Sequence, residues 1–160
     1  MLARKRLSLE QISALLRSKE MGVFAGVDLS DTDLRILDLA HANLSGADLR
    51  GVDLSGVALV MTNLAGAVLA DADLSATNLT DATLWMADLT GAKLSSANLT
   101  GAYLAGAKLA GADLRNATLL DANLWKADLR GADLEGANLD GASLRQTNLE
   151  NVVGMRSSDK

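Results

Sequence analysis

Leucine recurs at every fifth position of this chain, from Leu29 to Leu149, without an interruption. Phe24 holds the same place one step earlier, so 26 five-residue units run from residue 22 to residue 151. In an α-helix five residues turn through about 500°, and successive leucines would spiral around the surface. In a flat strand side chains alternate between two faces, so every second leucine would leave the core. The chain must therefore turn a corner every five residues and return each leucine to one interior.

The residues around each leucine favour such a corner. The residue two places before it is Ala in 17 of the 25 leucine units, which suits a narrow interior. The residue directly before it is Asp in ten units and Asn in seven, and Gly is frequent two places after it. Gly and Asx residues are types that turns favour. We therefore predict a β-solenoid with Leu and Ala inside and the other three positions of each unit outside.

This A-(D/N)-L-x-G pattern resembles the repeat of the pentapeptide-repeat family. The units at 47–51 (ADLRG) and 137–141 (ANLDG) match the motif of that family as they stand. The resemblance implies an all-β fold, a right-handed quadrilateral β-helix with four units, or 20 residues, in each coil. The repeat would then make about 6.5 coils, a rod roughly 31 Å long at the usual ladder spacing.

Four units per coil assign each unit to one of four sides. Side one starts with Leu29, side two with Leu34, side three with Leu39 and side four with Leu44, and each recurs every 20 residues. Sorted in this way, sides one and two hold nine of the ten Asp residues that precede a leucine. A sort by ten residues gives no such contrast, so the Asp distribution also favours a coil of 20 residues.

The N-terminal residues 1–21 predict an α-helical cap over the first coil. Ser8 and Gln11 have the spacing of a capping box. The apolar residues that follow fall on one face of a helix, and they are Leu9, Ile12, Leu15 and Leu16. A solenoid end exposes unpaired strand edges, which such a cap covers.

The C-terminal end has a different character. The β-helix is expected over residues 22–151, and the tail at 152–160 offers no helix. We interpret the apolar side chains of Val152, Val153 and Met155 as contacts of a homodimer formed through this end.

Composition excludes several classes of function. The chain has no cysteine, so it has no disulfide framework, thiol nucleophile or cysteine-based zinc site. Its net charge of −5 is opposite to that of a usual nucleic-acid binder. No apolar run approaches the roughly 20 residues of a membrane span, and no secretory core follows the first basic residues. The single histidine, His41, stands alone. We therefore expect a cytoplasmic, non-enzymatic protein without metal or cofactor that touches neither nucleic acid nor membrane.

Columns of carboxylates are the first candidate site. They consist of Asp28, Asp48, Asp88 and Asp128 on side one and of Asp33, Asp53, Asp73, Asp113 and Asp133 on side two. One interpretation is structural, because Asx side chains at this place hydrogen-bond turn backbone while nearby arginines balance the charge. The other is that the columns imitate duplex phosphates, as quinolone-resistance members of the resembled family do when they bind DNA gyrase. This chain differs from those members because it lacks a protruding loop and a C-terminal helix.

A row of outward aromatic residues is the second candidate site. Trp85 and Trp125 hold the same place in units 40 residues apart, and Tyr103 lies on the same side, side four, in the coil between them. Exposed aromatic residues on a rigid support are frequent hot spots of protein interfaces. The alternative is that the indoles simply pack over small neighbours such as Ala65 and Ala105. We interpret the row as the best candidate for binding a partner.

These observations favour a rigid, non-enzymatic scaffold for protein interactions, which the resemblance implies to be bacterial and regulatory. The partner would be another protein, whose identity the sequence does not give. One alternative is a duplex-DNA mimic that binds and inhibits or protects DNA gyrase through sides one and two. A further alternative is a structural rod whose only activity is end-to-end association.

Overall fold

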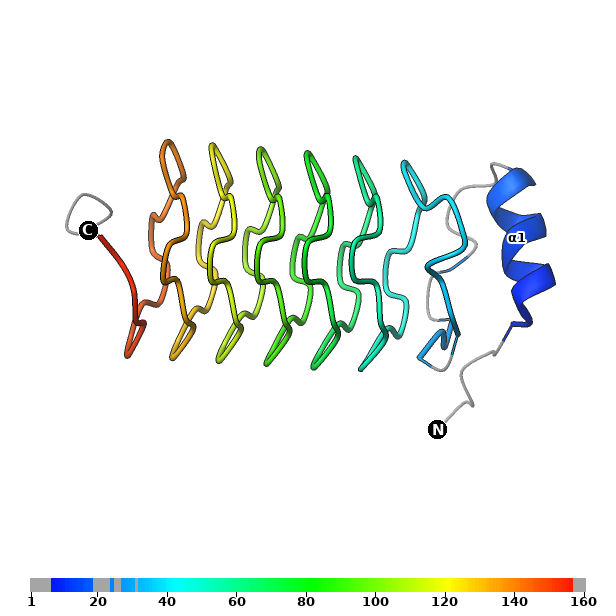
Figure 1. Cartoon of the computed structure of the whole chain (residues 1–160), viewed down its shortest axis with the longest axis horizontal. Coiled ribbons are helices and arrows are strands. Elements are labelled where there is room, and N and C mark those ends of the chain that lie inside the picture. The colour runs from blue at the N-terminus through cyan, green and yellow to red at the C-terminus, as the bar shows by residue number, and fades with distance from the viewer. Residues whose placement is uncertain (1–6, 19–23, 25–26, 31, 157–160) are drawn as a thin grey trace.

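The chain winds as a stack of square coils into a right-handed quadrilateral β-helix (Figure 1). The computed structural model describes residues 7–18, 24, 27–30 and 32–156. Every β-bridge among them is parallel and joins residues 20 apart, as Asn63 and Thr83 are joined. The predicted coil of four units is therefore confirmed. Each side contributes a single bridge residue to the ladder, so these residues form isolated bridges and no longer strands.

Each unit satisfies its five backbone N–H groups in a fixed way. In the unit at 97–101, the first N–H donates to the leucine carbonyl of the preceding unit and closes the turn. The second donates to the preceding coil, and the third and fifth donate to the following coil. The fourth donates to Oδ1 of Asn98 at 3.0 Å. The Asx side chain thus supplies the one acceptor that the backbone ladder does not provide.

This Asx contact is general along the rod. All 17 Asp and Asn residues that precede a repeat leucine accept the N–H of the residue two places later, at 2.9–3.4 Å. The backbone-bonding role expected of these residues is therefore present in each of them. It explains why Asx recurs directly before leucine, since a longer Glu or Gln would not close the same short loop.

The corners are four-residue turns whose third residue has a positive φ, as in a type II turn. Glycine is favoured there, for example Gly46 with φ 66°, but twelve other residues also take the left-handed conformation, including Asp81 with φ 55°. None of the twelve is β-branched, because a branched Cβ clashes in this region. Ile36 is the one β-branched residue at such a corner, and its turn does not use a positive φ.

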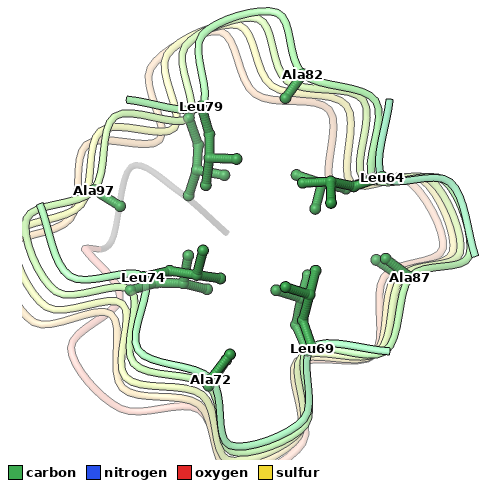
Figure 2. Packing of buried hydrophobic residues seen from close by; sticks show 14 of the residues in the cluster. Leu64, Leu69, Ala72, Leu74, Leu79, Ala82, Ala87 and Ala97 are labelled. Carbon is green, nitrogen blue, oxygen red and sulfur yellow. The ribbon is translucent and has the colours of Figure 1, made fainter. Parts of the chain in front are cut away.

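The core is a column of leucines with alanines between them. Figure 2 shows Leu64, Leu69, Leu74 and Leu79 pointing inward from the four sides of one coil. From side to side the repeat leucines are at most 1% exposed as far as Leu134. The prediction of inward leucines is correct for these coils. It fails in part at the C-terminal end, where the last two, Leu144 and Leu149, are only half-buried because no further coil covers them.

Helix α1 (Leu9–Ser18) precedes the solenoid and lies beside its first coil (Figure 1). The capping box forms, because Ser8 N–H donates to Gln11 Oε1 at 2.9 Å and Gln11 N–H donates to Ser8 Oγ at 3.3 Å. Ile12 is 1% exposed within the core cluster, and Leu7 and Leu15 pack against that cluster. Residues 1–6 and 19–21 of the expected cap, and the side chain of Leu16, lie outside the described residues. No helix in the described part of the chain is long and apolar enough to span a bilayer.

Truncating a central leucine should destabilise the rod strongly. Leu89 is completely buried, so Leu89→Ala is expected to lower the free energy of unfolding by about 2–5 kcal/mol. Leu149→Ala is the matched control, because its half-buried side chain loses less contact and leaves no enclosed cavity. Chemical denaturation of both variants measures the difference. Equal losses would contradict the buried leucine column.

Candidate interaction surfaces

The structure brings Trp85, Tyr103 and Trp125 together on side four. Tyr103 pairs in the ladder between residues 83 and 123, which belong to the units of the two tryptophans. Trp85, Tyr103 and Trp125 are 52%, 41% and 40% exposed, and they are among the largest exposed apolar side chains described. The row predicted from the sequence is therefore present as a row, one residue to a coil, along the axis of the rod.

Smaller residues complete this surface. Ala105 lies between the two tryptophans in their column and is 1% exposed, whereas Ala65, with a tryptophan on one side only, remains half-exposed. Met86 lies over Gly106, because a Cβ on that glycine would be 2.7 Å from the Met86 sulfur. The Lys126 ammonium lies 4.5 Å from the centroid of the Trp125 ring, in a cation–π contact. The indoles thus both cover a small neighbour and stay accessible.

We call Trp85, Met86, Tyr103, Trp125 and Lys126 the aromatic face. Its chemistry is that of an apolar strip with one cation at its edge. The adjoining side three exposes only separated apolar residues, such as Met61 at 55% and Leu120 at 36%, three coils apart. The aromatic face is therefore the larger continuous apolar feature of the rod's flanks.

The carboxylates of sides one and two face basic groups. In each Asp-Leu-Arg unit the arginine returns to the Asp of its own unit and donates through Nε and a terminal nitrogen. The pairs are Asp33–Arg35, Asp48–Arg50, Asp113–Arg115 and Asp128–Arg130, with contacts of 2.6–3.1 Å. These bidentate contacts are the strong, charge-assisted kind. They place positive charge directly over the acidic columns.

Neighbouring coils supply further cations to the same columns. Arg35 also donates to Asp53 at 2.8 Å, which lies one coil away. Lysines occupy the place of an Asp on two coils, and each approaches the Asp of the coil before it. The pairs are Lys93–Asp73 at 3.5 Å and Lys108–Asp88 at 3.4 Å. Asp133 lies 3.8 Å from Arg115, and Asp28 accepts the hydroxyl of Ser30 at 2.7 Å.

The arginines keep their carboxylates ionised. Hydrogen bonds from the Arg115 guanidinium hold the pKa of Asp113 below its ordinary value, despite partial burial, and Arg130 does the same for the pKa of Asp128. Asp48 is the most buried of the set, at 1% exposure, and its ion pair with Arg50 is 2.6 Å long. These columns are therefore charged but locally compensated.

The remaining expected positions lie apart from these surfaces. His41 is exposed at a corner with φ 61°. Within the described ranges, no group of three or more His, Cys, Asp or Glu residues is placed to hold a metal ion. At the C-terminal end, Val153 is 55% exposed and continues the ladder through Asp133, while Val152 and Met155 are half-buried against the core.

A square β-solenoid of five-residue units defines a class of protein, and comparison with known families agrees. The family model for pentapeptide repeats matches in eight copies, over residues 23–56, 59–95, 97–136 and 121–153. The chain belongs to the pentapeptide-repeat family. The resemblance found in the sequence is therefore confirmed. Among curated proteins, none matches the chain.

Several solved structures are similar to this chain. HetL, a pentapeptide-repeat protein involved in heterocyst differentiation regulation in the cyanobacterium Nostoc sp. strain PCC 7120, is 34% identical over 81% of this chain and 70% of its own, with a TM-score of 0.50. Rfr23 from the cyanobacterium Cyanothece 51142 is 30% identical over 71% and 84%, with a TM-score of 0.42. QnrB1, a plasmid-mediated fluoroquinolone resistance protein, is 22% identical over 71% and 66%, with a TM-score of 0.46.

The arginine–carboxylate pairs predict a pH dependence of stability. A carboxyl whose pKa is lower in the folded than in the unfolded chain contributes stability above its unfolded pKa, and this contribution is lost as the pH falls through the folded pKa. Asp113 and Asp128 are such carboxyls, with an ordinary pKa of 3.8. We expect Arg115→Gln with Arg130→Gln to lower the free energy of unfolding at neutral pH and to change it little at about pH 2.

Chemical denaturation of the parent chain and this double variant at a series of pH values checks this prediction. The gap between the two curves should narrow as the pH falls below the ordinary pKa of aspartate. A gap of constant size at every pH would show that the arginines act through packing alone.

Proposed function

We propose that this protein is a rigid scaffold that binds another protein through the aromatic face of side four. The observation that carries the proposal is the exposure of Trp85, Tyr103 and Trp125 in one row, on a rod whose other outward residues are mostly small or polar. Tryptophan and tyrosine are the residue types most enriched at binding hot spots. The similarity to HetL, which is involved in regulation of differentiation, supports a regulatory role for this chain.

The backbone under the aromatic face is already ordered. The carbonyl of Trp85 accepts the N–H of Gly66, and that of Trp125 accepts the N–H of Gly106, both at 2.8 Å. Binding therefore requires no loop to be ordered, and the entropic cost of association is smaller than for a flexible site. A partner would find two indoles two coils apart, about 10 Å along the axis.

The duplex-mimic alternative receives less support. A mimic of DNA needs carboxylates whose field extends into solvent, and four of the nine in sides one and two are held by the arginine of their own unit. Such pairing lowers the potential that a gyrase surface would meet. We therefore place the partner on side four and propose the acidic columns as part of the turn structure.

Removing the two indoles should abolish partner binding without unfolding the rod. Trp85→Ala with Trp125→Ala removes the ends of the aromatic face, while both positions lie outside the core. Met61→Ala with Leu120→Ala is the matched control, because it deletes comparable exposed apolar side chains from side three. Affinity capture from the native host, followed by mass spectrometry, should recover specific partners with the parent and the control only. Partners retained by the double-tryptophan variant would contradict the proposal.

A DNA gyrase supercoiling assay separates the two functions. We expect no inhibition or protection by the parent chain, because its acidic sides are compensated. Inhibition that weakens as salt rises, and that is lost when Asp33, Asp53, Asp113 and Asp133 are changed to Asn, would favour the mimic instead.

A further inference from the structure

The two ends of the rod differ in what covers them. At the N-terminal end α1 lies beside the first coil (Figure 1), and Ile12 is buried in the same cluster as the repeat leucines. At the C-terminal end Leu144 and Leu149 are only half-buried. A hollow of about 490 Å³ is lined there by Leu149 with Val152 and Met155. The C-terminal end therefore presents part of the apolar interior that α1 hides at the other end.

The backbone of the last coil is also open. In earlier coils the N–H of each leucine and the N–H two residues later donate to the following coil, as Leu119 and Asp121 do. Within the described part of the chain, the corresponding N–H groups of the last coil make no hydrogen bond. They belong to Leu139, Gly141, Leu144, Gln146 and Leu149. The carbonyls that would accept from a following coil are equally without a bond, and they are those of Ala137, Ala142 and Thr147.

The shape of this edge restricts what can pair with it. An exposed strand edge is a template for another strand. Here the edge consists of short segments set around a square, and each full segment offers one N–H and, two residues earlier, one C=O. The surface that matches all of them together is another square coil with its own open edge. In a second copy of this chain the N-terminal coil is covered by α1, so the matching surface is the C-terminal end.

We infer that two copies of this chain associate end to end through their C-terminal coils, related by a two-fold axis perpendicular to the rod. The two-fold axis reverses the chain direction, so facing segments pair antiparallel, with each leucine N–H donating to a carbonyl of the other copy. Val152 and Met155 of the two copies then cover the open ends of both leucine columns. Because both copies use the same surface, the interface is isologous and association stops at two.

The tail is placed to take part in this contact. Gly154 fits closely against the backbone of Leu134 and Glu135, with φ 77°, and turns the chain across the end of the rod. Arg156 then reaches Asp140 at 3.1 Å, at the corner between sides three and four. The segment between these two anchors carries Met155 onto the end face, so Met155 is the natural position at which to introduce a charge.

Sedimentation equilibrium at several concentrations tests the inference. The end of so slender a rod is a small interface, so we expect a dimer that dissociates on dilution. The parent chain should approach twice its mass of 16.6 kDa as its concentration rises. Met155→Glu should remain monomeric, because it buries a charge at the interface. Met61→Glu, with the same substitution at a 55% exposed site on side three, should dimerise like the parent.

Amide hydrogen exchange gives a second readout that does not depend on a variant. Exchange at Leu139 and Leu144 should slow as protein concentration rises, whereas Leu119, already bonded within the rod, should not change. Circular dichroism of Met155→Glu should match that of the parent, which distinguishes lost association from lost folding.

Three results would overturn the inference. The first is a parent chain that stays monomeric at every attainable concentration. The second is assembly beyond a dimer, which would mean head-to-tail stacking past α1. The third is a dimer that survives Met155→Glu but is lost with Trp85→Ala and Trp125→Ala, which would place the interface on the aromatic face. None of these results bears on binding of a different protein to side four.

Discussion

The hydrogen bonds between coils are the interaction on which the rest of this molecule depends. Each unit donates to the coil before it and to the coil after it, so the position of every outward side chain is set by its place in the ladder. The leucine column fills the interior that the ladder encloses, but leucines alone do not specify four sides. Closure into a square requires a left-handed residue at nearly every corner and an Asx acceptor at most turns. Backbone pairing, corner conformation and core packing therefore support one another.

Most of the fold and part of the candidate site could be predicted from the sequence, because a period of five has few structural solutions. It identified which residues are inside, and it placed Trp85, Tyr103 and Trp125 on one side. It could not predict that Lys126 lies over Trp125 or that Arg35 reaches Asp53 as well as Asp33, because these contacts depend on rotamers of long side chains. Nor does the period distinguish a leucine covered by another coil from an uncovered one.

Functional surfaces on such a rod differ from an ordinary cleft. A cleft gathers residues from distant parts of a fold, whereas here neighbours on a face are separated by 20 residues in sequence and one coil in space. The charged sides show how this geometry works, because an Asp column would repel itself if arginine and lysine did not recur at matching offsets. The aromatic face has no comparable structural need, since alanine occupies the place of Trp85 and Trp125 on other coils.

The turn of one quarter per unit has a consequence for how such a chain can change length. Loss or gain of a single five-residue unit would leave the core pattern intact, yet it would rotate everything beyond it by one side. A deletion of five residues between Trp85 and Trp125 would move the second indole to a different flank and split the row. Duplication of 20 residues would lengthen the rod by one coil, about 4.8 Å, and preserve every flank. Evolution of the gene in steps of twenty codons would therefore alter reach without altering recognition.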